Sequence, residues 1–483
     1  GMVQGVVIDE TQCIVDVNPA TGEEIARVPC TPLEEIPNII AAAHEAQLSW
    51  ANELTIDERA DLVKKGCGAL AGDLEGLAHL ITSEMGKILS EAREEVQDAA
   101  NKNEYIDHIV AANRAEVVGG SAEAQSLIVR DAMGVVAVLS PWNFPADEIL
   151  LLALPALIAG NAVIIKPSEV VPLTGERVVQ ALQSALPPGV VQIVQGDGAI
   201  GAKLIEGEVD MVAMTGSTAT GKKIMAVCAA DLKRLVLELG GKDPMIVFAD
   251  SDLDKAANDA VSFSLFNCGQ VCCAVERIFV DEAIKQEFED RVAAIASTFQ
   301  VGNGLDETTK VGPMVSAAQR NLVTNQVDSA IEAGAKVVFQ GEVPPELLAV
   351  GNFYPVTVLS EVTRAMDIDR NETFGPVVAI TTFDGTEDSA VALANDTEYG
   401  LASYVYTSDM VRARRVAMRI NAGQVGINCY SLIHANANCP WVGHKSSGFG
   451  YHSGPDGWRQ FSVPKSIVFD TPLPAEFSPK SSL

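Results

Sequence analysis

Three cysteines lie close together in the segment FNCGQVCCA at residues 266–274. The Gly-Gln pair ahead of Cys272 predicts a tight turn into a helix, whose N-terminus would lower the pKa of the Cys272 thiol. A thiolate there would be a nucleophile. Buried cysteines are more often small apolar packing residues, so this segment alone leaves both a catalytic and a packing role open.

Two glycine-containing turns could bind the phosphates of a dinucleotide. The sequence GDGAIG at residues 196–201 matches the G-x-G-x-x-G pattern between a predicted strand and a predicted helix. The acidic residue expected about 20 positions further on is absent, because the next strand ends in TGSTATG at residues 215–221. That turn also precedes a predicted helix, where free N–H groups and a hydroxyl could hold a pyrophosphate. Either turn alone could equally be an ordinary strand-to-helix connection.

The segment GNAVIIKPSE at residues 160–169 brings polar groups to the end of a buried strand. Open α/β sheets bind ligands at the carboxyl ends of their strands. Lys166 and Glu169 could therefore hold ribose hydroxyls, and a salt bridge at the strand end is the alternative.

The elements that position these segments follow from hydrophobic periodicity. Apolar residues recur every three to four positions between residues 36 and 110, which predicts helices. Short apolar runs then alternate with helical stretches, which predicts a parallel, doubly wound sheet. The predicted strands are residues 135–139, 162–165, 190–194, 211–214, 235–238 and 245–248, and the crossover helices are residues 150–159, 174–186 and 219–229.

A second α/β unit is predicted between residues 256 and 429, with strands at residues 276–280, 336–339, 377–382, 404–407 and 424–428. Residues 116–129 and 460–470 are strand-like and lie outside both sheets. We expect them to pair with a neighbouring subunit in a homodimer or homotetramer.

The predicted fold class is therefore α/β, with two doubly wound domains and a small β segment for oligomerisation. The dinucleotide-binding domain is assigned to residues 1–115 and 133–240, and the catalytic domain to residues 241–445. Residues 116–132 and 446–483 supply the oligomerisation strands and the C-terminal tail.

Composition excludes several functions. The chain has 483 residues and a formal net charge of -30, which argues against a nucleic-acid partner because phosphate backbones are bound by clustered Lys and Arg. No apolar run is long enough to cross a membrane, and the N-terminal sequence has no pattern of a secretory signal. The nine cysteines show no spacing typical of a zinc site or a disulfide framework. We therefore expect a cytoplasmic protein with free thiols, no metal and no membrane partner.

Seven motifs taken together, and in this order, resemble the aldehyde dehydrogenase superfamily over nearly the whole chain. They are PWNFP (141–145), GNAVIIKPSE (160–169), TGSTATG (215–221), LELGGKDP (237–244), FNCGQVCC (266–273), ETFGPV (372–377) and GQVGIN (423–428).

The resemblance implies NAD(P)-dependent oxidation of a small-molecule aldehyde to a carboxylic acid. Cys272 matches the nucleophile, which forms a thiohemiacetal and then a thioester. Asn143 matches the residue whose amide stabilises the oxyanion together with the backbone N–H of Cys272. Glu238 matches the general base that activates water for hydrolysis of the thioester, and a structural ion pair is the alternative role for this carboxylate.

The resemblance also implies the cofactor-binding residues. Those that match positions lining the dinucleotide are Trp142, Lys166, Glu169, Gly216 and Ser217, and those that match positions holding the nicotinamide ribose and ring are Glu372 and Phe374. A carboxylate at Glu169 would accept hydrogen bonds from ribose hydroxyls and repel a 2′-phosphate. NAD is therefore favoured, with NADP possible.

Two positions depart from the family pattern. Many members carry a Lys a few residues beyond PWNFP and a Glu near the C-terminus, which relay the proton from the catalytic residues. Leu152 and His452 stand at these positions here. His452 either replaces the relay or lies at the surface, and we expect the surface position.

Four residues match positions around the substrate tunnel: Phe144, Glu148, Phe266 and Trp441. Glu148 stands where an apolar side chain is common. An aromatic box with a carboxylate suits a cationic aldehyde. In the alternative, Glu148 faces solvent or a salt bridge and the tunnel accepts neutral aldehydes.

Two other functions compete with the hydrolytic one. In a CoA-acylating dehydrogenase, coenzyme A resolves the thioester, and such relatives commonly lack the base that Glu238 provides. A non-catalytic relative would usually lose the nucleophile or the base, and both are present here.

Overall fold

The computed structural model describes residues 7–8, 12–118, 125–431 and 435–470. The chain begins with a three-stranded antiparallel sheet that was not predicted, formed by β1 (Val7–Ile8), β2 (Cys13–Val17) and β3 (Glu24–Pro29). The predicted helical region follows as α1 (Ile36–Asn52), α2 (Ile56–Ala69), α3 (Leu74–Met85), α4 (Leu89–Ala100) and α5 (Asn103–Asn113). No helix of the described residues is long and apolar enough to cross a membrane.

A six-stranded sheet forms the centre of the first half of the molecule, in the order β18-β10-β9-β6-β7-β8. Five strands are parallel: β6 (Val135–Leu139), β7 (Ala162–Lys166), β8 (Val191–Ile193), β9 (Met211–Thr215) and β10 (Arg234–Glu238). The edge strand β18 (Gly448–Phe449) is antiparallel. The crossover helices are α6 (Asp147–Ile158), α7 (Pro172–Gln183), α8 (Gly198–Glu206) and α9 (Thr218–Cys228).

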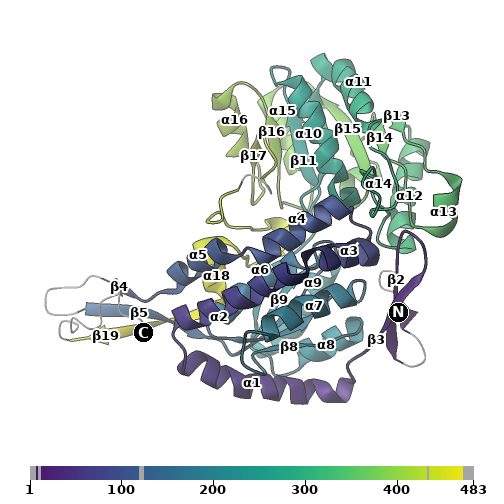
Figure 1. The fold of residues 1–483 in the computed structure, drawn as a ribbon. Helices are drawn as coiled ribbons and strands as arrows, with labels where there is room; N and C mark the ends of the chain where they lie inside the picture. Colours follow the sequence, from purple (N-terminus) through teal and green to yellow (C-terminus); the bar gives the residue numbers. More distant parts are fainter. Residues whose placement is uncertain (1–6, 9–11, 119–124, 432–434, 471–483) are drawn as a thin grey trace.

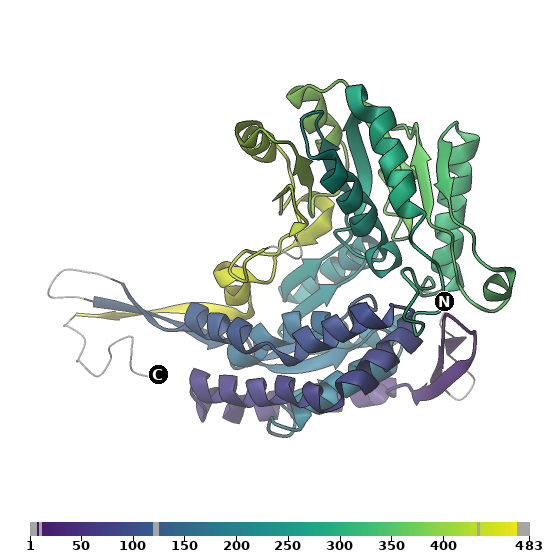
Figure 2. The same cartoon turned by 45° about the horizontal axis from the view of Figure 1, so that its top comes forward.

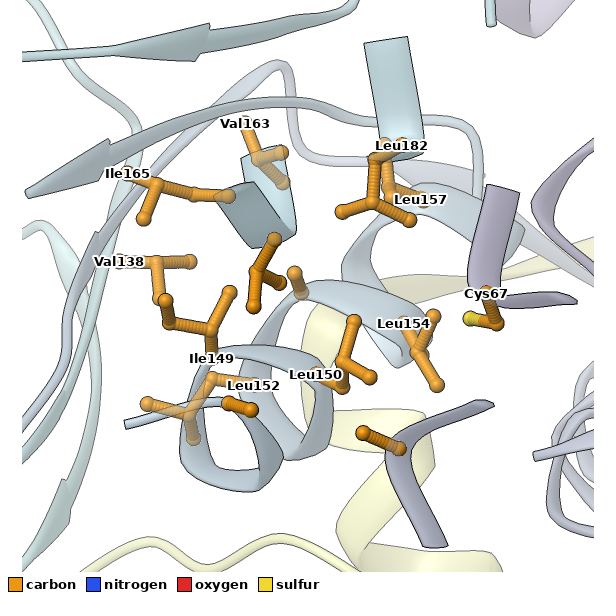
Figure 3. Close-up of a cluster of buried hydrophobic side chains, with 14 of the residues drawn as sticks. Cys67, Val138, Ile149, Leu150, Leu152, Leu154, Leu157, Val163, Ile165 and Leu182 are labelled. Carbon is orange, nitrogen blue, oxygen red and sulfur yellow. The ribbon is translucent and has the colours of Figure 1, made fainter. Parts of the chain in front are cut away.

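Both faces of this sheet are buried, as a doubly wound sheet requires. Val136 and Val138 of β6 pack into one apolar cluster with α6 and α7, whereas Val135 and Ala137 pack into a second cluster with α1 and α8. Figure 3 shows part of the first cluster, in which Ile149 of α6 lies toward Val138 of β6.

The strand order reverses between β6 and β9. From β6 the chain continues to β7 and β8 on one side, and then crosses to β9 and β10 on the other side. Such a switch point opens a crevice at the carboxyl ends of the strands, which is the usual ligand site of this architecture.

A seven-stranded sheet forms the second half, drawn at the top of Figure 1, in the order β13-β14-β15-β12-β11-β16-β17. Its strands are β13 (Lys336–Gln340), β14 (Thr357–Ser360), β15 (Val377–Phe383), β12 (Val275–Asp281), β11 (Asp243–Val247), β16 (Tyr404–Tyr406) and β17 (Gly426–Ile427). Only β13 is antiparallel to its neighbour. Its longer helices are α10 (Leu253–Leu265), α11 (Lys285–Ala296), α12 (Ala317–Glu332), α15 (Glu387–Asn395) and α16 (Met410–Ala417), and the shorter helices α13 (Pro345–Val350) and α14 (Asp367–Arg370) lie between α12 and β15.

Two details of this sheet differ from the sequence prediction. The strand expected at residues 245–248 was placed in the first sheet, but β11 lies between β12 and β16 of the second sheet. A hydrophobic run predicts a strand but does not indicate which sheet the strand joins. Here the chain passes from the first sheet to the second after Gly240-Gly241. Strand β14 was not predicted.

The strand-like segments outside the two sheets form a third sheet in the order β19-β5-β4. It consists of β4 (Glu116–Val118), β5 (Gln125–Ala132) and β19 (Ser462–Phe469), and it projects from the body in both views (Figures 1 and 2). β5 and β19 pair along their whole length within the chain. The predicted α/β class with two doubly wound sheets and a small β segment is confirmed, and pairing with another subunit stays a prediction.

Candidate active site

The loop that carries Cys272 begins with a strained turn. Asn267, Cys268 and Gly269 have φ angles of 49°, 58° and 71°, in the left-handed region that side chains normally avoid. Each non-glycine residue held there costs on the order of 1–3 kcal/mol, and such strain is concentrated at functional sites. Gly269 is required because a Cβ atom would lie 2.1 Å from the carbonyl oxygen of Gly375.

Cys272 does not begin a helix. It lies in a turn between this strained segment and β12, so the expected lowering of its pKa by a helix N-terminus is wrong. The neighbouring Cys273 thiol and burial instead raise the pKa of Cys272 well above that of a free thiol, and the carboxylates of Glu148 and Asp243 add to the shift. The thiol is therefore neutral in the isolated chain.

Asn143 holds this loop from the other half of the molecule. Its Nδ2 atom donates a hydrogen bond to the carbonyl oxygen of Gln270 at 3.1 Å, and Asn267 Nδ2 donates to the carbonyl oxygen of Asn143 at 3.1 Å. An amide nitrogen has two hydrogens, so Asn143 keeps a second donor in addition to the one bound by Gln270. Asn143 is buried, and its position is fixed at both ends.

Glu238 is the last residue of β10 and is only 2% exposed. Neither carboxylate oxygen has a well-aligned hydrogen-bond partner among the residues that the structure describes. Burial and the nearby carboxylate of Glu148 raise the pKa of Glu238 well above its usual range, and the main-chain amide of His452 opposes part of this shift. A buried carboxyl group without a counter-ion is unlike a structural ion pair and is a typical environment of a general base.

Two glycines join Glu238 to the nucleophile loop. A Cβ atom on Gly241 would lie 2.3 Å from the carbonyl oxygen of Cys272, and one on Gly240 would lie 2.6 Å from Glu372 Oε1. The segment that follows the base therefore packs directly against the backbone of Cys272, and only glycine allows this approach.

The predicted dinucleotide residues lie at the carboxyl edge of the six-stranded sheet. Lys166 ends β7, and its Nζ atom lies 3.2 Å from Glu169 Oε2, with both side chains nearly buried. Gly216 follows β9, and Ser217 caps the N-terminus of α9 beside the switch point. The turn at residues 196–201 follows the edge strand β8, and the Asp197 carboxylate already caps α8 there. TGSTATG is therefore the turn that fits a pyrophosphate at the switch point.

Trp142, Phe374 and Glu372 meet where the two halves join. The rings of Trp142 and Phe374 pack edge to face with centroids 5.5 Å apart. Glu372 Oε1 accepts a hydrogen bond from the backbone N–H of Gly241 at 3.0 Å, and burial raises its pKa to about 8. These residues fit the planar ring and ribose of a nicotinamide nucleotide.

The two residues that depart from the family pattern, Leu152 and His452, are both buried. Leu152 is fully buried in the apolar cluster around α6 and is labelled in Figure 3. His452 is 2% exposed, so the expected surface position is wrong. Its Nδ1 atom lies 2.8 Å from Ser453 Oγ, and burial lowers its pKa to about 4. Leu152 cannot carry a proton, and His452 is a neutral imidazole at pH 7 rather than a charged group.

Glu148 is half-buried and forms no salt bridge among the residues that the structure describes. Its Oε2 atom accepts a hydrogen bond from Thr215 Oγ1 at 2.9 Å. Burial and the adjacent Asp147 raise the pKa of Glu148 to about 7. Its carboxylate acts electrostatically on both Glu238 and Cys272, which places it inside the site.

The other tunnel residues line the same apolar cluster as Cys272. Phe144, Phe266 and Trp441 are partly buried against it, and the first two rings have centroids 6.0 Å apart. The buried ammonium of Lys87 lies 3.7 Å from the centroid of the Phe144 ring. An internal cation therefore already occupies one face of this aromatic wall.

The remaining two cysteines of the motif are packing residues. Cys268 is buried against Met314, with the sulfur atoms 3.6 Å apart. Cys273 is fully buried, and its sulfur lies 3.4 Å from the Tyr430 hydroxyl.

Several supporting residues were not predicted. Glu276 accepts hydrogen bonds from the backbone N–H groups of Thr373 and Phe374, both at 2.8 Å, and from Lys242 Nζ at 2.6 Å. In the sequence, Thr215 is only the first residue of a glycine-containing turn. Asn267 carried a usable signal, because asparagine next to Cys-Gly is a common choice for left-handed backbone.

Comparison with known proteins identifies the family of this chain. A family model described as "Aldehyde dehydrogenase family" matches residues 7–467. The chain belongs to the aldehyde dehydrogenase family, whose members are NAD(P)-dependent oxidoreductases.

Individual relatives cover almost the whole chain. Betaine aldehyde dehydrogenase of Bacillus subtilis is 38% identical over 94% of this chain and 94% of its own length. Glutarate-semialdehyde dehydrogenase of Pseudomonas putida is 37% identical over 92% of this chain and 91% of its own. A betaine aldehyde dehydrogenase from Staphylococcus aureus, solved in complex with NAD+, has a TM-score of 0.88 and 34% identity, and covers 96% of this chain and 92% of that one.

Proposed function

We propose that the chain oxidises an aldehyde to a carboxylic acid with NAD+ through a thiohemiacetal and a thioester on Cys272, and that Glu238 activates the water that hydrolyses the thioester. One observation carries this proposal. Asn143 contacts Gln270 just before Cys272, and the glycines after Glu238 pack on the carbonyl of Cys272. Nucleophile, oxyanion donor and base thus converge from three separate segments.

The chain's own groups account for the covalent steps. The Cys272 thiol releases its proton to solvent water as its sulfur attacks the aldehyde carbon, and the second N–H of Asn143 with the backbone N–H of Cys272 stabilises the oxyanion. When bound, NAD+ supplies the acceptor for the hydride that leaves this carbon. Glu238 takes a proton from water as its oxygen attacks the thioester carbon, and the C–S bond breaks to return the Cys272 thiolate.

The cofactor assignment rests on residues at the carboxyl edge of the first sheet. Gly216 and Ser217 would bind the pyrophosphate, Lys166 with Glu169 would bind the adenosine ribose, and Trp142 would line the dinucleotide. The buried Glu169 carboxylate disfavours a 2′-phosphate, so we propose NAD as the preferred cofactor and NADP as the weaker one.

For the substrate, we infer an uncharged aldehyde. The relatives named above carry the names of a betaine aldehyde and of glutarate semialdehyde, so their names indicate opposite charges. In this chain, Lys87 covers one face of Phe144, and Glu148 is bound to Thr215. The aromatic wall and the carboxylate are thus already partnered. Equal or higher kcat/KM for neutral aldehydes than for a 4-aminobutanal-type aldehyde of equal length supports this inference, and a clear preference for the cation contradicts it.

The hydrolytic step is tested with Glu238→Gln. We expect one equivalent of NADH in a burst, followed by arrest, with the acyl group on Cys272 detected by mass spectrometry. Full steady-state turnover by this variant would overturn the role of Glu238.

The CoA-acylating alternative predicts that the wild-type enzyme forms an acyl-CoA and needs coenzyme A for turnover. Product analysis with and without coenzyme A therefore distinguishes the two functions.

A further inference from the structure

Glu148 is brought to the base by the sheet itself. Thr215 of β9 and Glu238 of β10 are register partners in neighbouring parallel strands, so their side chains lie on the same face of the sheet. The preceding pair of core residues, Met214 and Leu237, packs on the opposite face against α8 and α9. Thr215 and Glu238 therefore point toward α6, whose first turn carries Glu148.

The contacts on this face make Glu148 a partner of Glu238. The Thr215 hydroxyl donates its hydrogen bond to Glu148 Oε2 at 2.9 Å and so fixes the carboxyl group. Glu148 is the side chain that most raises the pKa of Glu238 after burial. Because the Glu148 carboxylate raises the pKa of the buried Glu238, the pair favours a state with one proton between the two groups.

Other charged groups surround Glu148. Asp147 of its own helix and Glu95 of α4 raise its pKa, whereas Lys102, which precedes α5, lowers it. Lys102 forms an ion pair with Asp147. The Asp147 side chain is 25% exposed, so this ion pair reaches the surface next to Glu148 in the chain.

We propose that Glu148 is a positioning residue for Glu238: held by Thr215, it shares a proton with the base and accepts the proton that Glu238 removes from the hydrolytic water. This inference rests on the proposed role of Glu238 as the base. It also accounts for the departures from the family pattern, because Leu152 and His452 carry no charge that could serve the relay.

The step balances without a further reactant. The water oxygen forms a bond to the thioester carbon, and one water proton passes to Glu238. The C–S bond breaks, and its electron pair stays on the sulfur of Cys272. The proton then moves from Glu238 to the Glu148 carboxylate, directly or through a water, and leaves to solvent past Asp147 and Lys102.

The first experiment measures the pH dependence of kcat for Glu148→Gln. Loss of the neighbouring carboxylate lowers the pKa of Glu238, so the rise of kcat with pH should shift to lower pH by about one unit or more. Loss of the proton acceptor should also lower the maximal kcat about tenfold, less than the roughly 100-fold or greater loss expected for a direct acid or base. The NADH burst should remain, because formation of the thioester does not need this proton acceptor.

Two further variants and one control separate positioning from structure. Glu148→Asp keeps a carboxyl group and should restore part of kcat and of the wild-type pH profile. Thr215→Val leaves Glu148 in place without its hydrogen bond, so it should shift the profile in the same direction as Glu148→Gln. Glu289→Gln is the matched control, because Glu289 is a buried carboxylate that accepts a hydrogen bond from the Ser360 hydroxyl outside the site. It should leave the profile unchanged.

The outcomes distinguish this inference from the proposed function. If Glu238→Gln arrests after a burst while Glu148→Gln retains the wild-type kcat and pH profile, the role of Glu148 is overturned and the base remains. A Glu148→Gln variant that raises KM only for cationic aldehydes, with kcat unchanged for neutral ones, also overturns it and assigns Glu148 to substrate binding. If Glu148→Gln does not fold, an unshifted profile of Thr215→Val overturns the inference.

Discussion

Asn143 Nδ2 donates a hydrogen bond at 3.1 Å to the carbonyl oxygen of Gln270, two residues before Cys272. The side chain that stabilises the oxyanion in the proposed mechanism therefore also fixes the backbone of the nucleophile loop. Its two N–H groups have separate tasks, one structural and one catalytic.

Removal of the Asn143 amide should loosen the nucleophile loop and also remove one oxyanion donor. For Asn143→Ala we expect kcat to fall by about 10²–10³-fold, the loss typical of one oxyanion donor. Stopped-flow NADH formation measures the acylation step directly. Asn267→Ala is the comparison, because Asn267 also donates to Gln270 but supplies no oxyanion donor in the mechanism. If Asn143→Ala acylates at the wild-type rate, the donor role is wrong.

The thiol of Cys272 should be weakly reactive in the enzyme without cofactor. Its pKa is raised by the Cys273 thiol and by burial, so little thiolate is present at pH 7. We expect iodoacetamide to modify Cys272 slowly at neutral pH and much faster only in strongly alkaline solution. Peptide mass spectrometry measures each site, and the exposed Cys439 serves as the control within the same sample. Rapid modification of Cys272 at pH 7 would contradict the shift.

Gly241 should tolerate no side chain. A Cβ atom there lies 2.3 Å from the carbonyl oxygen of Cys272, so Gly241→Ala must displace the nucleophile loop. We expect more than a tenfold loss of kcat and a loss of about 1–3 kcal/mol in the free energy of unfolding, as for other overpacked sites. Gly68→Ala in α2 is the control, because no atom lies within 4 Å of its added Cβ. It should keep full activity, and equal behaviour of the two variants would refute the close approach.

The sequence predicted the elements better than their arrangement. The strands of the first sheet could be predicted because periodicity is a local signal, and the ordered motifs gave the proposed nucleophile, base and oxyanion donor, whose roles stay predictions. The sheet of β11 could not be predicted, since an apolar run carries no information on its neighbours. The same limit explains why the helix expected at Cys272 and the surface position expected for His452 are both wrong. The turn before Cys272 leads into a strand, and the burial of His452 depends on packing of segments far apart in the chain.

The relation of Glu148 to Glu238 shows this limit most clearly. The two residues are joined through the register of β9 and β10 and the start of α6, and no spacing in the sequence expresses that contact. Its position in the family pattern predicts that Glu148 lines the substrate tunnel, and that role stays a prediction. The structure adds a hydrogen bond from Thr215 to Glu148 on the face of the sheet that carries Glu238.

Burial of His452 should make the protein sensitive to acid. Its pKa in the folded chain is about 4, whereas an unfolded histidine titrates near 6.5. Between these values the unfolded chain binds more protons, so the free energy of unfolding falls as the pH is lowered from 6.5 to 4. Protonation of His452 alone should lower the free energy of unfolding by roughly 2 kcal/mol at pH 5 and leave it unchanged at pH 7.5.

His452→Gln removes the titrating group and keeps a polar side chain beside Ser453. Thermal midpoints at pH 7.5 and pH 5 provide the measurement, and we expect a smaller decrease for the variant than for the wild type. His444→Gln is the control, because His444 is exposed, and it should show the wild-type decrease. Identical decreases for His452→Gln and the wild type would show that His452 does not titrate with a lowered pKa.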